Sequence, residues 1–167
     1  MRRLILLLAL AATLAIPAVA SGGGQPTRSK IPDSAFTGSA PAGAVCAFAV
    51  SIAPVVNREY ELTYPPAANG DIVKHDSGNV VERFTNDETG KSIDVNISGP
   101  VTTVIHADGS QTGTFVGPTA LINVLPGYNP GLVIVEGRLV DTGSPSGVVT
   151  LVSFTGTVTL DVCAALA

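Results

Sequence analysis

The chain has 167 residues, of which 46% are hydrophobic and 13% charged, and its formal charge is −4 at pH 7. This length supports one domain with a hydrophobic core. The acidic balance argues against nucleic acid and anionic membrane surfaces as partners, because both require clustered Lys and Arg.

Residues 1–20 have the three parts of a secretory signal peptide. Arg2 and Arg3 give the positive start, residues 4–16 are apolar except for one threonine, and small residues precede a cleavage site between Ala20 and Ser21. The alternative is an uncleaved membrane anchor, but the apolar run is shorter than the roughly 20 residues that a span needs. We therefore expect a secreted, extracellular chain with no membrane contact after cleavage.

Removal of this segment would leave residues 21–167, with 7 Lys and Arg against 13 Asp and Glu and a formal charge of −6. Residues 21–43 are rich in Gly, Ser, Thr and Pro and have no apolar period. Such a composition is typical of a flexible, disordered linker. It could be a spacer that tethers the domain to the cell surface, or only a frayed end.

Residues 44–167 alternate apolar and polar residues with a period of two, which predicts strands with one face in a core. The alternation is clear around Phe48, Tyr60, Ile93 and Val158. No later segment of ten or more residues has the period of a helix. We expect a single antiparallel β domain of about eight or nine strands, either a β-sandwich or a closed β-barrel.

Turn signals separate these runs. Asn69-Gly70, Ser77-Gly78, Thr89-Gly90 and Asp108-Gly109 each fall between apolar segments, as the turn of a β-hairpin requires. Gly156 lies inside the last run, where a bulge or a sharp bend is the usual reason for glycine.

The chain has two cysteines, Cys46 and Cys163. In an exported protein they favour a disulfide between the first and last strands of the domain. The alternatives are an intermolecular bridge or two free thiols. Cys163 falls on the polar parity of its strand and Cys46 on the apolar parity. Either the strand end twists out of register or the bond lies at the rim of the core.

No motif for catalysis, a metal or a cofactor stands out. His75 and His106 are interpreted as surface residues, since a metal site needs three or four converging ligands. The segment around Ser144 and Ser146 resembles a nucleophile elbow but has Pro145 at its centre, so a loop is the better interpretation.

Carboxylates and tyrosines offer weaker candidates. Glu59 and Glu61 share a strand face, as a catalytic pair would, but two charges on a solvated face are commoner. The tyrosines could line the mouth of a pocket, with core packing the favoured role for the first two; they are Tyr60, Tyr64 and Tyr128.

Glu136 and Arg138 would place one charged pair on an otherwise apolar strand face. Such a pair inside an apolar pocket is the basis for an alternative hypothesis, a barrel enzyme of the isomerase or lyase kind. The simpler interpretation is a strand that leaves the core at its end. The sequence favours binding over catalysis: a small apolar ligand, a cell-surface partner, or a structural role in the cell envelope.

One stretch carries a resemblance. Phe84-Thr85-Asn86, residues 89–92, residues 96–100 and Asp108-Gly109-Ser110 resemble small secreted proteins of actinobacteria for which no function is established. The resemblance covers residues 84–110 and implies secretion and an antiparallel β domain, with no catalytic residues to carry over. The Gly-rich strands are also similar to the barrels of allene oxide cyclases and dirigent proteins, an analogy of fold alone.

Overall fold

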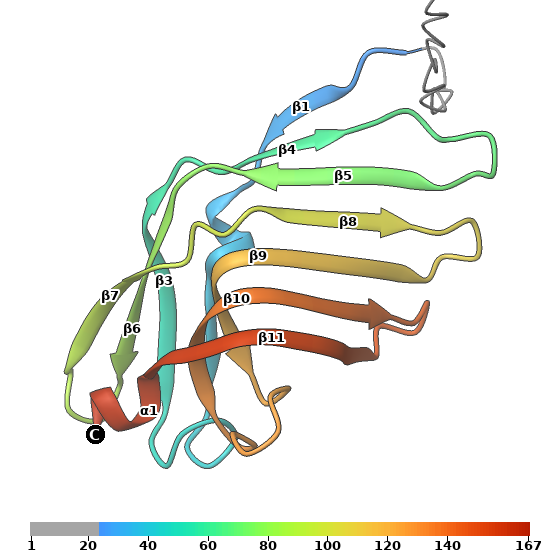
Figure 1. Ribbon diagram of the computed structural model, residues 1–167. Coiled ribbons are helices and arrows are strands. Elements are labelled where there is room, and N and C mark those ends of the chain that lie inside the picture. The colour runs from blue at the N-terminus through green and yellow to red at the C-terminus, as the bar shows by residue number, and fades with distance from the viewer. Residues whose placement is uncertain (1–23) are drawn as a thin grey trace, which may run out of the picture.

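The computed structural model describes residues 24–167 (Figure 1). The signal peptide and its cleavage site at Ala20 and Ser21 lie outside these residues, so both stay predictions. The described chain forms two antiparallel sheets that do not close into a barrel. The all-β prediction is confirmed, and the closed-barrel alternative is wrong.

Sheet A has seven strands, in the order β1-β4-β5-β8-β9-β10-β11. They are β1 (Thr27–Lys30), β4 (Tyr60–Thr63), β5 (Ile72–Ser77), β8 (Val101–Ile105), β9 (Gln111–Ile122), β10 (Leu132–Gly143) and β11 (Val149–Asp161). Sheet B has the order β2-β3-β6-β7, with β2 (Gly38–Ala40), β3 (Val50–Asn57), β6 (Val80–Asn86) and β7 (Ser92–Asn96). A 3₁₀ helix, η1 (Asp33–Phe36), and a short helix, α1 (Val162–Leu166), complete the chain.

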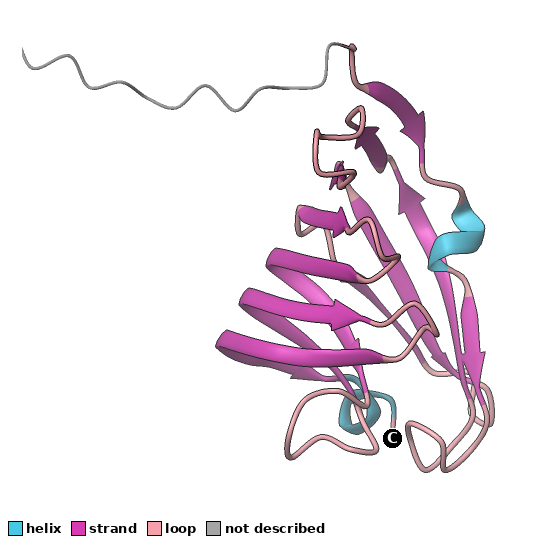
Figure 2. Cartoon of the chain, turned by 90° about the vertical axis from the view of Figure 1, so that its right-hand side faces the viewer, coloured by secondary structure: helices cyan, strands magenta, loops and turns pink. Residues whose placement is uncertain are grey.

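The segment predicted as a disordered linker is ordered from residue 24 onward. β1 pairs with β4 of sheet A, β2 pairs with β3 of sheet B, and η1 lies between them (Figure 2). Strand pairing gives this polar segment backbone partners that its composition does not reveal. The half-buried Ile31 and Phe36 provide its apolar anchors. The flexible-linker prediction for residues 21–43 is therefore corrected for the part that the structure describes.

Besides the passage from β1 through η1 to β2, the chain passes between the sheets at three places that lie close together. The first follows β3, the second follows β5, and the third lies between β7 and β8. Arg58 N donates to Asn79 O at 2.8 Å, and Ile97 N donates to Val80 O at 3.0 Å, which ties the three crossings to one another. Ser77-Gly78 is thus a corner between the sheets, and the predicted hairpin at this position is wrong.

Glycines form a row across the three longest strands. Gly117 of β9 pairs with Gly137 of β10, which pairs with Gly156 of β11. Figure 1 shows β9 and β10 turning sharply between their upper and lower halves. Gly137 has φ 148°, and a Cβ there would collide with the Thr155 carbonyl oxygen. The row lets the strands bend so that their lower halves pack on sheet B.

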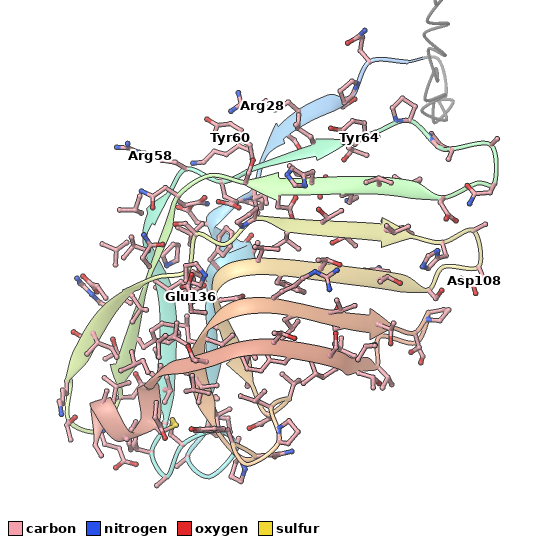
Figure 3. The ribbon with its side chains drawn as sticks, in the orientation of Figure 1. Arg28, Arg58, Tyr60, Tyr64, Asp108 and Glu136 are labelled. Atoms are coloured by element: carbon pink, nitrogen blue, oxygen red, sulfur yellow. A yellow bond between two sulfur atoms is a disulfide. The ribbon has the colours of Figure 1, made fainter. Side chains whose placement is uncertain are left out.

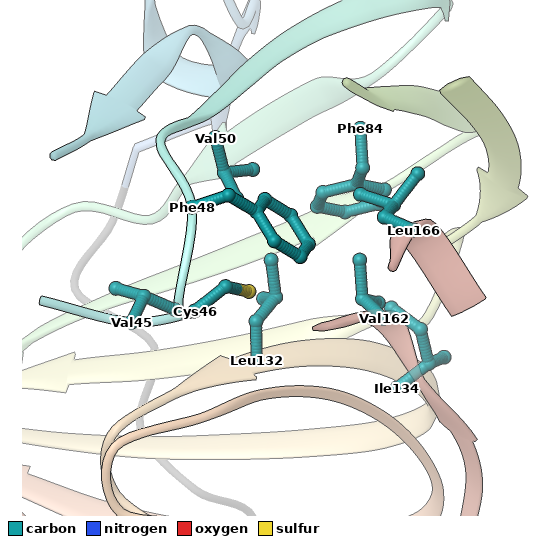
Figure 4. Close-up of a cluster of buried hydrophobic side chains, with 9 residues drawn as sticks. All are labelled: Val45, Cys46, Phe48, Val50, Phe84, Leu132, Ile134, Val162 and Leu166. Carbon is teal, nitrogen blue, oxygen red and sulfur yellow. The ribbon is translucent and has the colours of Figure 1, made fainter. Parts of the chain in front are cut away.

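The main core lies between sheet B and the lower halves of β10 and β11 (Figure 4). Phe84 of β6 is fully buried there and packs in one cluster with Leu132 of β10 and Leu166 of α1. A second cluster, under the β9–β10 loop, contains Leu121 and Leu139. The two clusters lie on opposite parities of β10, which explains why residues 132–135 form an unbroken apolar run.

The cysteines form a disulfide between the loop before β3 and α1, with Cα atoms 5.4 Å apart. The parity conflict at Cys163 disappears because β11 ends before it. The carboxylate of Asp161 accepts a hydrogen bond from Ala164 N at 2.9 Å and caps the first turn of α1. The helix turns Cys163 back toward the rim of the core. Among residues 24–167, no helix is long and apolar enough to cross a membrane.

Candidate functional site

Two adjoining cavities lie between the sheets, and we call them together the inter-sheet cavity. The smaller has a volume of about 240 Å³ and the larger about 420 Å³. The two cavities share a wall, which is formed by five residues: Ala35, Phe36, Ile97, Phe115 and Thr119. Most of the lining is apolar, and the larger volume falls in the usual range for small-molecule sites, about 300–1,000 Å³.

The first polar group in this cavity is Glu59, at the crossing from sheet B to sheet A. Its main chain is held by Asn57, whose Oδ1 accepts from Glu59 N at 3.0 Å, and by Ile31, whose N donates to Glu59 O at 3.1 Å. The side chain folds over Gly78, which has no Cβ to obstruct it. Glu59 is only 5% exposed, and its Oε2 is buried without a hydrogen-bond partner.

The second group is Asp76 on β5, which pairs with Glu61 on β4 and Val101 on β8. Its Oδ1 is also buried without a partner. Burial, and then the charge of Glu61, raises the pKa of Asp76, against the opposing effects of Lys74 and His75. Burial also raises the pKa of Glu59, and the charge of Asp76 adds to this. Both carboxyls line the smaller cavity, and the charge of Asp76 acts on Glu59.

The third group is Glu82 on β6, which faces the larger cavity. The alternation of β6 places it between Val80 and Phe84 on the buried face of sheet B, and it is 6% exposed. Burial raises the pKa of Glu82 to about 7. No charged partner among residues 24–167 counteracts this effect, so Glu82 carries a proton for much of the time near neutral pH.

Glu61 differs from these three. Burial acts to raise its pKa, but Lys74 Nζ at 3.0 Å and Thr63 Oγ1 at 2.8 Å stabilise the carboxylate, and the net pKa is lowered. The interpretation of Glu59 and Glu61 as two charges on a solvated face is therefore wrong. Glu59 precedes the strand and is buried, and Glu61 is half-buried in an ion pair.

The histidines lie apart from the inter-sheet cavity. His75 Nδ1 is 2.9 Å from Thr102 Oγ1, and His106 Nε2 is 2.9 Å from Thr112 Oγ1. His106 also lies 3.4 Å from Asp71. Residues 24–167 contain no group of three or more His, Cys, Asp or Glu side chains placed to hold a metal ion.

The serine loop and the charged pair on β10 are exposed. Ser144 and Ser146 hydrogen-bond each other at 2.8 Å within the turn that joins β10 to β11. Glu136 and Arg138 are both exposed to solvent, and Glu136 is labelled in Figure 3. The barrel-enzyme hypothesis required a closed barrel and an inward-facing charged pair, and residues 24–167 form neither.

The sequence predicts that the tyrosines lie at the mouth of a pocket or in the core. Tyr60 instead lies under the guanidinium of Arg28, 3.7 Å from the ring centre (Figure 3), and Tyr64 is 41% exposed. Tyr128 lines a cavity, a space of about 410 Å³ beside the disulfide. That cavity has fewer buried polar groups than the inter-sheet cavity, which makes the latter the stronger candidate site.

Sequence reasoning missed Asp76 and Glu82. The alternation of β6 was visible as Val80, Glu82 and Phe84 on one parity, and a carboxyl between two core residues is the signal that could have found Glu82. Comparison with protein-family models, with curated proteins and with solved structures finds no match to this chain. The site therefore rests on its own geometry.

Proposed function

We propose that this chain is a secreted, non-enzymatic binding protein that holds a small, mainly apolar molecule in the inter-sheet cavity. The observation that carries the proposal is a pair of adjoining, mainly apolar cavities, the smaller of which is lined by two carboxyls with buried oxygens that lack hydrogen-bond partners. Buried polar atoms without partners are rare in folded proteins, and a ligand is one thing that satisfies them. The disulfide is compatible with an extracellular location.

The first test is native mass spectrometry on the protein recovered from its own culture medium. The proposal expects a mass excess that is lost on denaturation, and an N-terminus at Ser21 if the signal peptide is cleaved as predicted. A second test titrates the purified protein with pyrene, a neutral apolar probe whose emission reports a non-polar environment.

Matched variants locate the binding. Thr119 lines both parts of the inter-sheet cavity, so Thr119→Trp should block pyrene uptake. Thr155 is exposed on β11, and Thr155→Trp should leave uptake unchanged. A bare protein mass together with no pyrene uptake by the unmodified chain would refute the proposal.

A specific feature favours a second candidate function, self-association through a strand edge. β11 is an outer strand of sheet A, and residues 149–160 contain no charged residue. The opposite outer strand, β1, carries Arg28 and Lys30, the kind of charge that usually protects an edge. Val152 on β11 is 59% exposed. Antiparallel pairing with β11 of a second copy would cover this edge without bringing like charges together.

Sedimentation velocity tests this second function. We expect a concentration-dependent dimer that Val152→Lys abolishes, with the circular dichroism spectrum unchanged. A protein that sediments as a monomer up to high concentration would refute it.

A further inference from the structure

The carboxyls of the inter-sheet cavity have no positive partner. Neither part of the cavity is lined by Lys, Arg or His. The nearby cations are engaged elsewhere: Lys74 pairs with Glu61, and Arg83 pairs with Asp94 through two hydrogen bonds of 2.7 and 2.8 Å. Among residues 24–167, no Lys, Arg or His therefore forms an ion pair with Glu59 or Asp76, although the charges of Lys74 and His75 partly offset that of Asp76 at longer range.

A neutral apolar ligand would leave this deficit in place. It would displace water from the cavity while Glu59 Oε2 and Asp76 Oδ1 still lacked hydrogen-bond donors. An unmade hydrogen bond of a buried acceptor weakens binding, and it does so more when the acceptor is charged. A ligand that carries hydrogen-bond donors can bond to these oxygens, and it should therefore bind more tightly than a neutral apolar ligand.

A primary ammonium group fits this need in three ways. It has three N–H donors, enough for both orphaned oxygens. Its positive charge offsets the burial and the charge of Asp76 that raise the pKa of Glu59. The rings of Phe36 and Phe115 line the same space, and aromatic faces attract cations.

The larger part of the cavity suits the rest of such a molecule. Its lining includes Ile52, Ala120 and Ile122, and its only carboxyl is that of Glu82. Burial raises the pKa of Glu82 to about 7, so near neutral pH it is ionised for less of the time than an ordinary glutamate and competes less for the cation. An apolar tail can therefore lie here while the ammonium group stays with Glu59 and Asp76.

Resting on the proposed function, we propose that the ligand is an organic amine, with its ammonium group bound between Glu59 and Asp76 and its apolar tail in the larger part of the inter-sheet cavity. This assigns a chemical class to the ligand. It also gives the two unpartnered carboxyls a role that core packing does not explain.

The test compares three probes of equal length on the unmodified, disulfide-bonded protein by isothermal titration calorimetry at pH 7.5. The probes are n-hexylamine, 1-hexanol and hexanoate. We expect hexylamine to bind at least tenfold more tightly than hexanol, and hexanoate not to bind. Hexanol binding as tightly as hexylamine would overturn the amine assignment and leave the apolar-ligand function standing. Absence of binding by both would overturn the two together.

Variants then test the two named carboxyls. Glu59→Gln and Asp76→Asn should each weaken hexylamine binding at least tenfold and leave hexanol binding unchanged. Glu136→Gln removes the same charge from an exposed position and should change neither. Equal weakening of hexylamine by Glu136→Gln would show that only the net charge matters and would overturn the assignment.

Discussion

Glu82 should make the protein less stable as the pH rises. Its pKa is about 7 in the folded chain, against 4.5 for an ordinary glutamate. Between pH 4.5 and pH 7 the unfolded chain loses the proton of Glu82 while the folded chain keeps it, so the free energy of unfolding falls over this range. Above pH 7 both states are ionised and the free energy stays at the lower value. The shift corresponds to a loss of about 3 kcal/mol at pH 8.

The perturbation is Glu82→Gln, which keeps the shape of the side chain and removes its titration. The measurement is urea unfolding of both proteins at pH 5 and pH 8, followed by circular dichroism with linear extrapolation. Relative to the parent, the variant should gain about 3 kcal/mol more at pH 8 than at pH 5. Any constant cost of burying the amide cancels in this difference.

The control is Glu136→Gln, which removes an exposed carboxyl and should give the same small effect at both pH values. Glu59 and Asp76 also have raised pKa values, so a pH dependence of the same sign should remain in Glu82→Gln. An equal difference between parent and Glu82→Gln at pH 5 and pH 8 would refute the reasoning.

Three further predictions concern stability. Replacing Cys46 and Cys163 by Ala opens a loop with a sequence separation of 117, and the chain-entropy model gives a loss of about 5 kcal/mol in the unfolding free energy; unchanged urea midpoints would contradict it. Gly137→Ala should destabilise by more than about 1 kcal/mol, since its φ is positive and the Thr155 backbone is too close, while Gly143→Ala, which has space, should be close to neutral in the same assay. Asn86→Ala should loosen the end of α1 and the β6–β7 turn, because Asn86 Nδ2 donates to Leu166 O at 3.1 Å and its Oδ1 accepts from Glu88 N at 2.9 Å and Thr89 N at 3.2 Å; faster amide exchange at these two places checks this.

Much of the fold follows from local pattern. The period of two identified most strands from β3 (Val50–Asn57) onward, and Asp108-Gly109 does join β8 to β9, with Gly109 at φ 83°. The alternation around Cys46 and Phe48 also predicted a strand, which is wrong, because residues 44–49 form the loop before β3. Ser77-Gly78 shows the limit of this reasoning. The dipeptide is typical of a hairpin turn. Whether the next strand returns to the same sheet depends, however, on strands that are distant in the sequence. Here β6 pairs with β3 and β7 and not with β5.

The site was harder to predict than the fold. Glu59 lies one residue before β4, where alternation no longer decides which way a side chain points, and its burial depends on Gly78 from another crossing. Asp76 enters the cavity because β8 and β9 place Val101 and Phe115 beside it. Contacts of this kind, between segments far apart in the chain, cannot be predicted from the local sequence.

The disulfide also divides the chain by how it would respond to a protease. A single cut in any loop between Cys46 and Cys163 leaves both fragments covalently joined, and the protein runs as one species until it is reduced. β1, η1 and β2 lie outside this ring. A cut at the exposed residues 41–44 would leave them held by strand pairing and packing alone. Loss of the segment with β1, η1 and β2 would remove Phe36, which lines both parts of the inter-sheet cavity. Cleavage within residues 41–44 would therefore open one side of the site.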